Sequence, residues 1–258
     1  MEPARVPGRW SQMDDSQNSQ HSPHSPHLSG KRDVVLPADA GEIVLIGDPR
    51  VAAVPLRECG DPLVDCREVL RVDRRRSDPD GDWAHLRAGV LNRLLHAEAL
   101  LPDGLRWLLV EGYRPPALQQ SIFDGYATHL RELRPRADEA EIHAAATRWC
   151  APMETAGHTA GAAVDLTVCT AEGTEVDMGS PEAATPEESG GACYTHAPGL
   201  SEHAARNRTT MVGALTSAGL VNYPTEWWHW SYGDRYWAWT TGTRAALYGP
   251  CTRAATSA

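Results

Sequence analysis

The chain has 258 residues, of which 41% are hydrophobic and 22% are charged, and its formal net charge at pH 7 is −10. These proportions are typical of a soluble protein that is long enough for one sizeable core. The negative charge and the lack of a basic run argue against a nucleic acid or an anionic membrane surface as a partner, and no apolar run is long enough to span a bilayer.

The amino terminus, MEPARVPGRWSQMDDSQNSQ, lacks the basic start and the apolar stretch of a secretory signal. The six cysteines are scattered without a C-x-x-C pair, which is typical of reduced thiols in the cytosol. We therefore expect a cytoplasmic protein without a cysteine zinc site.

Residues 1–32 are rich in Ser, His, Gln and Pro and have almost no apolar periodicity. Such a segment cannot bury enough apolar surface to offset the entropy lost on ordering, so we expect a disordered polar tail. Its HSPHSPH stretch could bind a transition metal, although solvated low complexity is the favoured interpretation. Residues 33–258 are expected to form a single domain.

Short β-branched or leucine-rich runs predict strands at Ile43–Ile46 and Arg106–Glu111. Between them, Asp82 is a candidate N-cap for a helix that ends before Pro102 and Gly104. The apolar residues of that helix recur at helical spacing: Leu86, Val90, Leu94, Ala97 and Leu101.

Further helices are expected at Ala117–Leu133, Ala137–Trp149 and Glu202–Ser217, with an irregular insertion at about residues 171–200. No internal repeat is visible. The mixture of helices with strands that end in hairpins favours an α+β fold, in which a small antiparallel sheet carries the functional site and helices pack on it.

A first polar cluster lies in GHTAGAAVDL, where Gly157 and Gly161 bracket His158 and a strand over residues 162–168 follows. Because side chains alternate along a strand, Asp165 points away from the apolar face formed by Val164, Leu166 and Val168. Asp165 is therefore interpreted as a ligand that projects into a cavity, and the alternative is a solvent-facing acid.

A second cluster lies in EWWHWSYGDRYWAWT, at Glu226–Thr240. Gly233-Asp234 suits the loop of a β-hairpin, which would pair His229 with Ala238 and gather four tryptophans on the core face. Glu226 would then require a turn or bulge to approach His229. The alternative is an aromatic hairpin in which the histidine is a packed polar residue.

Together the clusters supply three side chains of the type that bind metals, His158, Asp165 and His229, and one spare carboxylate, Glu226. Catalytic zinc sites use three protein ligands and leave a position for water, whereas structural sites use four. Three candidate ligands with a spare carboxylate therefore predict a catalytic zinc site, and so an enzyme.

The motifs resemble the D-Ala-D-Ala metallopeptidase family, most closely its vancomycin-resistance dipeptidase branch, over roughly residues 105–232. The matching pieces, in the order of the family, are EGYRP at Glu111–Pro115, HTAGAAVDL at His158–Leu166, MGS at Met178–Ser180, HAA at His203–Ala205 and EWWH at Glu226–His229.

The resemblance implies one Zn²⁺ per chain held by His158, Asp165 and His229, with Glu226 as general base and acid and Arg114 stabilising the transition state. It implies a small peptide substrate, D-Ala-D-Ala or a related dipeptide, and a role in peptidoglycan turnover. The ligand chemistry agrees, since zinc activates water and a nearby carboxylate can carry its proton.

Two positions depart from the family pattern. Ala156 replaces a serine whose hydroxyl would help to bind the substrate carboxylate, and Ala183 stands where the dipeptidases have the acid that holds the substrate ammonium. Glu182 is one residue away and could substitute for that acid, or it could be a solvated acid in an acidic stretch. The chemistry is therefore better determined than the substrate.

Two other functions remain open. A D,D-carboxypeptidase or other peptidoglycan peptidase would act on a longer chain and would need no pocket for a free ammonium. A non-catalytic metal-containing binding protein would use the tryptophan-rich segment as an interface, although such a protein would not need the spare carboxylate of Glu226.

Overall fold

The computed structural model describes residues 43–253. The predicted tail at residues 1–32 lies outside the described residues, and the predicted domain boundary at residue 33 stays a prediction. In the described part of the chain, no helix combines the length and apolarity that crossing a bilayer requires.

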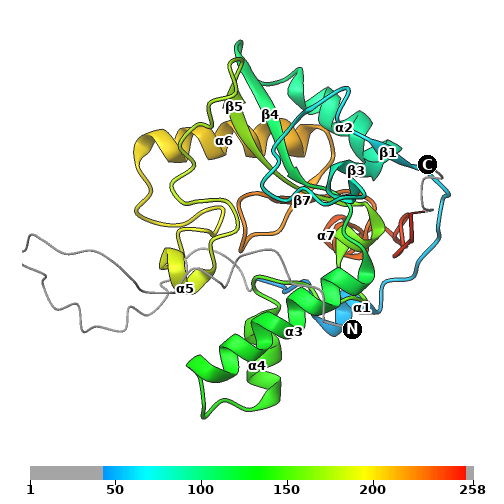
Figure 1. The fold of residues 1–258 in the computed structure, drawn as a ribbon, viewed down its shortest axis with the longest axis vertical. Coiled ribbons are helices and arrows are strands. Elements are labelled where there is room, and N and C mark those ends of the chain that lie inside the picture. Colours follow the sequence, from blue (N-terminus) through cyan, green and yellow to red (C-terminus); the bar gives the residue numbers. More distant parts are fainter. Residues whose placement is uncertain (1–42, 254–258) are drawn as a thin grey trace, which may run out of the picture. The chain divides into compact units, whose positions relative to one another are not determined.

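A five-stranded sheet organises the protein (Figure 1). Its strands, in spatial order, are β2 (Arg71–Val72), β4 (Leu105–Glu111), β5 (Ala163–Thr170), β7 (His229–Ser231) and β6 (Val221–Asn222). The pair β2–β4 is parallel and the other three pairs are antiparallel. The predicted α+β class is confirmed, with one parallel pair at the edge of the sheet. A separate antiparallel pair joins β1 (Leu63–Asp65) to β3 (His85–Arg87).

Seven α-helices lie in the described residues. They are α1 (Pro49–Ala52), α2 (Ala88–Glu98), α3 (Pro116–Leu133), α4 (Glu139–Ala146), α5 (Pro186–Ser189), α6 (Glu202–Ser217) and α7 (Arg235–Thr241). The predicted boundaries of α6 are confirmed, and those of α3 and β4 are confirmed to within one residue. Residues 171–200 are irregular apart from the single turn of α5.

The helix predicted from Asp82 begins later than expected. Asp82 opens a 3-10 turn, Leu86 lies in β3, and α2 begins only at Ala88. The apolar spacing could not show this, because Leu86 pairs with Val64 in a strand and is still fully buried.

The main core lies on one face of the sheet, where α2 and α6 pack against each other and against β5. Val164, Leu166 and Val168 of β5 belong to this core, as the alternation predicted. Asp165 lies between them in sequence and therefore projects to the opposite face. The helices α3 and α4 enclose a second apolar cluster of their own, seen apart from α2 and α6 in Figure 1.

The hairpin predicted for Glu226–Thr240 is wrong. Strand β7 ends at Ser231, and Trp237 and Trp239 lie on helix α7. The side chain of Asp234 accepts a hydrogen bond from the backbone N–H of Trp237, so this residue caps a helix and does not turn a hairpin. His229 consequently lies opposite Asp165 of β5, not opposite Ala238.

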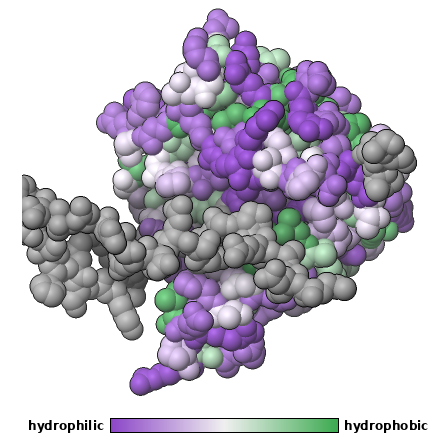
Figure 2. Space-filling model, in the orientation of Figure 1, coloured by the Kyte–Doolittle hydropathy of each residue, from purple (hydrophilic) through white to green (hydrophobic). Residues whose placement is uncertain are grey.

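The predicted strand at Ile43–Ile46 is also wrong, because this segment is irregular and leads into α1. Ile46 is nevertheless buried, packed in a small cluster with Val51 and Tyr223. On the surface, hydrophilic side chains predominate over the face seen in Figure 2, with apolar ones in small groups. Among residues 43–253, the large exposed apolar side chains are Leu56, Val69, Leu95, Leu100, Leu133 and Met153.

Candidate metal centre

The three predicted ligands come from two strands and a turn that the sheet holds side by side. His158 lies in a 3-10 turn at Gly157–Ala160, which leads into β5 through Gly161. Gly161 has φ +63°, a left-handed conformation that a glycine adopts without strain. Asp165 and His229 are direct register partners of β5 and β7.

The donor atoms of the three ligands form a small triangle. Oδ1 of Asp165 lies 3.0 Å from Nδ1 of His229 and 3.3 Å from Nε2 of His158, and the two histidine nitrogens are 3.2 Å apart. For zinc bonds of about 2.0–2.1 Å, tetrahedral geometry places donor atoms roughly 3.3 Å apart. All three side chains are buried. The spacing and the two-nitrogen, one-oxygen donor set fit Zn²⁺.

The two histidines are oriented differently, His158 by a backbone carbonyl and His229 by the side chain of Asp165. Nδ1 of His158 lies 2.7 Å from the carbonyl oxygen of Gly112. A proton on that nitrogen leaves Nε2 free to face the cluster, an arrangement common among metal ligands. His229 instead turns Nδ1 toward Asp165, and its Nε2 is buried without a hydrogen-bond partner among the described residues.

Asp165 is held in its charged form. Burial alone would raise its pKa, but the nearby imidazoles of His158 and His229 outweigh this and lower the pKa well below its usual value. A carboxylate is the form that binds a metal. The negative charge of Asp165 would repel a second carboxylate placed beside it.

Glu226 occupies that position. One carboxylate oxygen, Oε2, lies 3.9 Å from Nδ1 of His229. The irregular stretch before β7 brings them together: the N–H of Glu226 donates to the carbonyl of Tyr223, and the amide of Asn222 donates to the carbonyls of Glu226 and His229. The predicted turn is confirmed.

The electrostatics of Glu226 differ from those of Asp165. Burial and then the charge of Asp165 raise the pKa of Glu226 well above its usual value. Its Oε1 is buried without a hydrogen-bond partner among the described residues. A buried carboxyl beside the three candidate metal ligands, with a raised pKa and an oxygen that accepts no hydrogen bond from the described residues, is suited to receive and return a proton.

Arg114 follows the end of β4 and forms a two-pronged ion pair with Glu111. Its Nε and Nη2 donate to the two oxygens of Glu111 at 2.7 and 2.6 Å, and its Nη1 donates to the side chain of Gln119 at 2.7 Å. The backbone N–H of Arg114 donates to the carbonyl of His158, so this segment is bonded directly to one of the three candidate ligands. The charge of Arg114 also lowers the pKa of Glu226, so the two lie within electrostatic reach.

Glu111 and Gln119, which hold Arg114, were not predicted to be site residues. Burial would raise the pKa of Glu111, but Arg114 outweighs it and keeps the carboxylate charged. Three of the five N–H groups of Arg114 are engaged by residues of the described part of the chain, which leaves one N–H on each of its two terminal nitrogens. The signal available in the sequence was Glu111 itself, which shares the EGYRP motif with Arg114.

Glu182 is not a solvated acid. Its side chain is 2% exposed and lies 3.3 Å from Arg76 and 4.0 Å from Arg75. Burial raises its pKa to about 7, and the charges of Asp165 and Glu111 act in the same direction, which places Glu182 in the electrostatic neighbourhood of the cluster. The next residue, Ala183, has φ +62°. Ala156 is buried and offers no hydroxyl.

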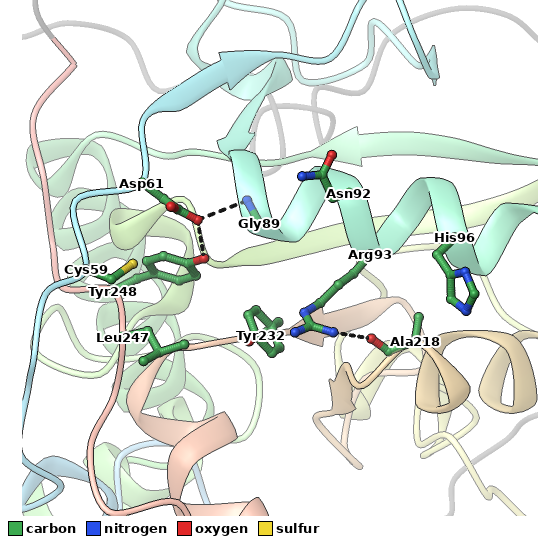
Figure 3. Close-up of a pocket in the computed structure, with 10 residues that line it drawn as sticks. All are labelled: Cys59, Asp61, Gly89, Asn92, Arg93, His96, Ala218, Tyr232, Leu247 and Tyr248. Atoms are coloured by element: carbon green, nitrogen blue, oxygen red, sulfur yellow. Dashed lines mark hydrogen bonds between the residues drawn. The ribbon is translucent and has the colours of Figure 1, made fainter.

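A separate cavity of about 490 Å³ lies beside α2, and no predicted site residue lines it (Figure 3). Several of its polar side chains pair with one another or with the backbone: the Tyr248 hydroxyl donates to Asp61, and Arg93 stacks on the ring of Tyr232 and donates to the carbonyl of Ala218. It belongs to the helical side of the sheet and is not part of the metal cluster.

The fold therefore gathers a buried cluster of metal-type ligands, a carboxyl with a raised pKa and a fixed arginine, which are the groups of a metal-assisted hydrolase. Residues 86–242, more than half of the chain, match the family model described as D-ala-D-ala dipeptidase. The chain belongs to this peptidase family.

The similarity to a curated relative covers most of both proteins. The chain is 29% identical over 213 residues to a D-alanyl-D-alanine dipeptidase of Synechocystis sp., which corresponds to 71% of this chain and 86% of the relative.

Three solved structures are similar at 17% sequence identity. The LD-carboxypeptidase LdcB has a TM-score of 0.41 and the match covers 71% of this chain and 73% of that one. A Zn(II) complex of a mutant of the vancomycin-resistance D,D-pentapeptidase VanY has a TM-score of 0.37, with 76% and 96% covered. VanYB in complex with D-alanine-D-alanine has a TM-score of 0.38, with 74% and 93% covered.

Proposed function

We propose that this peptidase is a zinc-dependent dipeptidase that hydrolyses D-Ala-D-Ala or a related small dipeptide. The observation that carries the proposal is the buried triangle of donor atoms, 3.0–3.3 Å apart, with the carboxyl of Glu226 beside it. The Synechocystis relative supports the choice of substrate class.

His158, Asp165 and His229 would hold one Zn²⁺ per chain. When bound, the ion would lower the pKa of water and polarise the scissile carbonyl. The rigid register of β5 and β7 sets the distance between two of the ligands before any ion binds, so little reorganisation accompanies binding.

Glu226 would act as the general base and then as the general acid. Its carboxylate takes a proton from the attacking water and delivers it to the leaving amine. Burial and the charge of Asp165, which raise its pKa, favour retention of that proton between the two steps. The free Oε1 gives the proton a place to reside.

Arg114 would stabilise the oxyanion of the tetrahedral intermediate. Glu111 and Gln119 fix the plane of its guanidinium, and its remaining N–H groups can donate to the substrate. Donors that are fixed before the reaction stabilise the transition state most, because they need not reorganise as charge develops.

Glu182 is the candidate that would receive the ammonium of a free dipeptide. Its side chain is buried, and the charge of the ligand Asp165 affects its pKa. Within two residues of Ala183, Glu182 is the only acidic residue. Its ion pair with Arg76 must then share the carboxylate with the substrate or open.

That ion pair also favours a second candidate function. A D,D-carboxypeptidase, which cleaves the end of a longer peptide, would leave Glu182 paired with Arg76 and would need no ammonium contact. We propose a role in peptidoglycan turnover with either activity. The cytoplasmic location stays a prediction.

The test is to assay the zinc-loaded protein on D-Ala-D-Ala, on mixed D- and L-dipeptides and on a pentapeptide ending in D-Ala-D-Ala. Wild type is expected to turn over a dipeptide, and Glu226→Gln, which keeps the shape but not the base, is expected to lose about 10²-fold or more in kcat. Preference for the pentapeptide would support the carboxypeptidase. Equal inactivity of both proteins on all substrates, with zinc bound, would leave a non-catalytic metal protein.

A further inference from the structure

A buried arginine on α6, Arg208, binds both ends of the irregular segment 178–195. Its Nε donates to the carbonyl of Met178 at 2.7 Å, its Nη1 to that of Tyr194 at 2.6 Å and its Nη2 to that of Ala192 at 2.7 Å. Only 3% of the residue is exposed. Among residues 43–253, all acceptors of this guanidinium are backbone carbonyls, so it bridges the two ends of the segment, which we call the 178–195 loop.

A buried cation without a carboxylate partner is costly, and burial lowers the pKa of Arg208 to about 10. It nevertheless remains charged at neutral pH. The benefit is geometric: an irregular loop cannot pair its own carbonyls as a helix or sheet does, and a planar guanidinium presents several donors in fixed directions. A lysine at this position would offer a point charge without that planar array.

Arg208 also contacts the segment that carries Glu226. Its guanidinium carbon lies 5.5 Å from the centre of the Trp227 ring. The indole N–H of Trp227 donates to the hydroxyl of Ser180 at 3.0 Å, and its backbone N–H donates to the carbonyl of Cys193 at 2.9 Å. The loop and the residue next to Glu226 therefore form one packed unit.

The same loop carries Glu182, whose side chain is only 2% exposed and lies 3.3 Å from Arg76. The indole N–H of Trp149, which follows α4, donates to the carbonyl of Ala183 at 3.3 Å. A displacement of the loop would thus move Glu182 relative to Glu226 and the ligands.

Two sequence motifs without a chemical role in the proposed reaction are explained by this docking. In MGS, Met178 accepts from Arg208, Gly179 passes close to α6 with φ +84°, and Ser180 accepts from Trp227. In HAA, Ala204 is fully buried, and a Cβ placed on Gly179 would lie 3.1 Å from the Cβ of Ala204. Both motifs supply the contact between the loop and α6.

We propose that Arg208 is a positioning residue, which fixes the 178–195 loop against the Glu226 segment and so sets the wall of the substrate pocket that carries Glu182. The kinetic consequence rests on the proposed function, whereas the ordering of the loop does not. Because a wall residue contacts substrate in the ground state and transition state alike, its displacement raises KM more than it lowers kcat.

The experiment compares Arg208→Lys with two variants of the same helix. Arg206→Met alters an arginine whose side chain is 66% exposed, and Met211→Ala opens the main core without removing a donor to the loop. The measurements are the amide hydrogen exchange of residues 178–195, the bound zinc, the melting temperature, and kcat and KM separately for the best peptide.

Arg208→Lys is expected to raise KM by roughly tenfold, the loss of one charge-assisted contact, with a smaller change in kcat. Exchange of the loop amides should rise by about tenfold or more while zinc is retained. Arg206→Met should match wild type, and Met211→Ala should lower the melting temperature with KM and loop exchange unchanged.

Two results would overturn the inference: loop exchange and KM in Arg208→Lys equal to those of wild type, or the same rise in both for Met211→Ala, which would mark a general loss of stability. If zinc-loaded wild type hydrolyses no peptide, the proposed function fails separately. The inference then stands if loop exchange still rises selectively in Arg208→Lys, and falls if it does not.

Discussion

Asp165 and His229 are register partners on adjacent antiparallel strands, and this pairing brings Oδ1 of the acid to 3.0 Å from Nδ1 of the imidazole. The sheet, and not a flexible loop, therefore fixes two of the three candidate ligands. Such a site is expected to bind its metal with little reorganisation and to depend strongly on the charge of Asp165.

The first prediction concerns that charge. Asp165→Asn keeps the size of the side chain but removes the anionic oxygen, and we expect bound zinc to fall by about tenfold or more at limiting metal. Zinc per chain, measured by elemental analysis after dialysis against a weak chelator, checks this. Glu226→Gln is the matched control, since it removes a neighbouring buried carboxylate that is not a ligand and should retain zinc. Full zinc in Asp165→Asn would show that the metal is held elsewhere.

The second prediction concerns Arg114. Arg114→Lys keeps the positive charge but cannot form the two-pronged pair with Glu111, so kcat should fall by about 10²-fold with zinc retained. Arg131→Lys is the control: Arg131 forms a similar two-pronged pair with Glu139, but on the exposed surface of α3 and α4. Its kcat should equal that of wild type. A wild-type kcat in Arg114→Lys would remove Arg114 from the catalytic groups.

Helix α6 and strand β5 were predicted correctly because their caps and their alternation are visible in their own sequences. Helix α6 follows Ser201, whose side chain caps it, and Gly219 lies just beyond its end, so both ends are visible in the sequence. The alternation in β5 correctly separated Asp165 from the core face. The Glu226–Thr240 segment failed because its alternating tryptophans suit a strand, while Asp234 is equally a helix cap. The local pattern suits either a strand or a helix, and the long-range pairing of β7 with β5 decides between the two.

The candidate site was predictable in its residue types but not in its surroundings. His158, Asp165, Glu226 and His229 come together as expected. The burial of Glu182 was not predictable, because it depends on Arg76, which lies 106 residues earlier, and on the docking of the loop to α6. Contacts between segments so distant leave no spacing pattern along a single sequence.

The third prediction uses the raised pKa of Glu182. Burial raises it from 4.5 to about 7 in the folded protein, so the folded state binds the proton more tightly than the unfolded state. The resulting stability is fully present below pH 4.5 and is lost as the pH rises to 7, by at most about 3 kcal/mol. In metal-free protein, Glu182→Gln should therefore show a flatter dependence of the free energy of unfolding on pH between 4.5 and 7.

Urea unfolding at a series of pH values measures that difference. Glu202→Gln is the control, because the side chain of Glu202 is 93% exposed on α6, and its curve should run parallel to that of wild type. Parallel curves for wild type and Glu182→Gln would mean that Glu182 titrates as a solvated acid.

The last prediction separates backbone strain from close packing at the loop. Gly179 and Gly199 both have left-handed backbones, with φ +84° and +76°. A Cβ on Gly179 would lie 2.6 Å from Cδ2 of Leu200 and 3.1 Å from the Cβ of Ala204, whereas a Cβ on Gly199 would meet nothing within 4 Å. Substitution by alanine costs both sites the left-handed strain of about 1–2 kcal/mol, and only Gly179 adds overpacking of about 1–3 kcal/mol. Urea unfolding should therefore find Gly179→Ala less stable than Gly199→Ala. If the two lose equal stability, the 178–195 loop is not packed on α6 as closely as the structure shows, because only close packing distinguishes the two glycines.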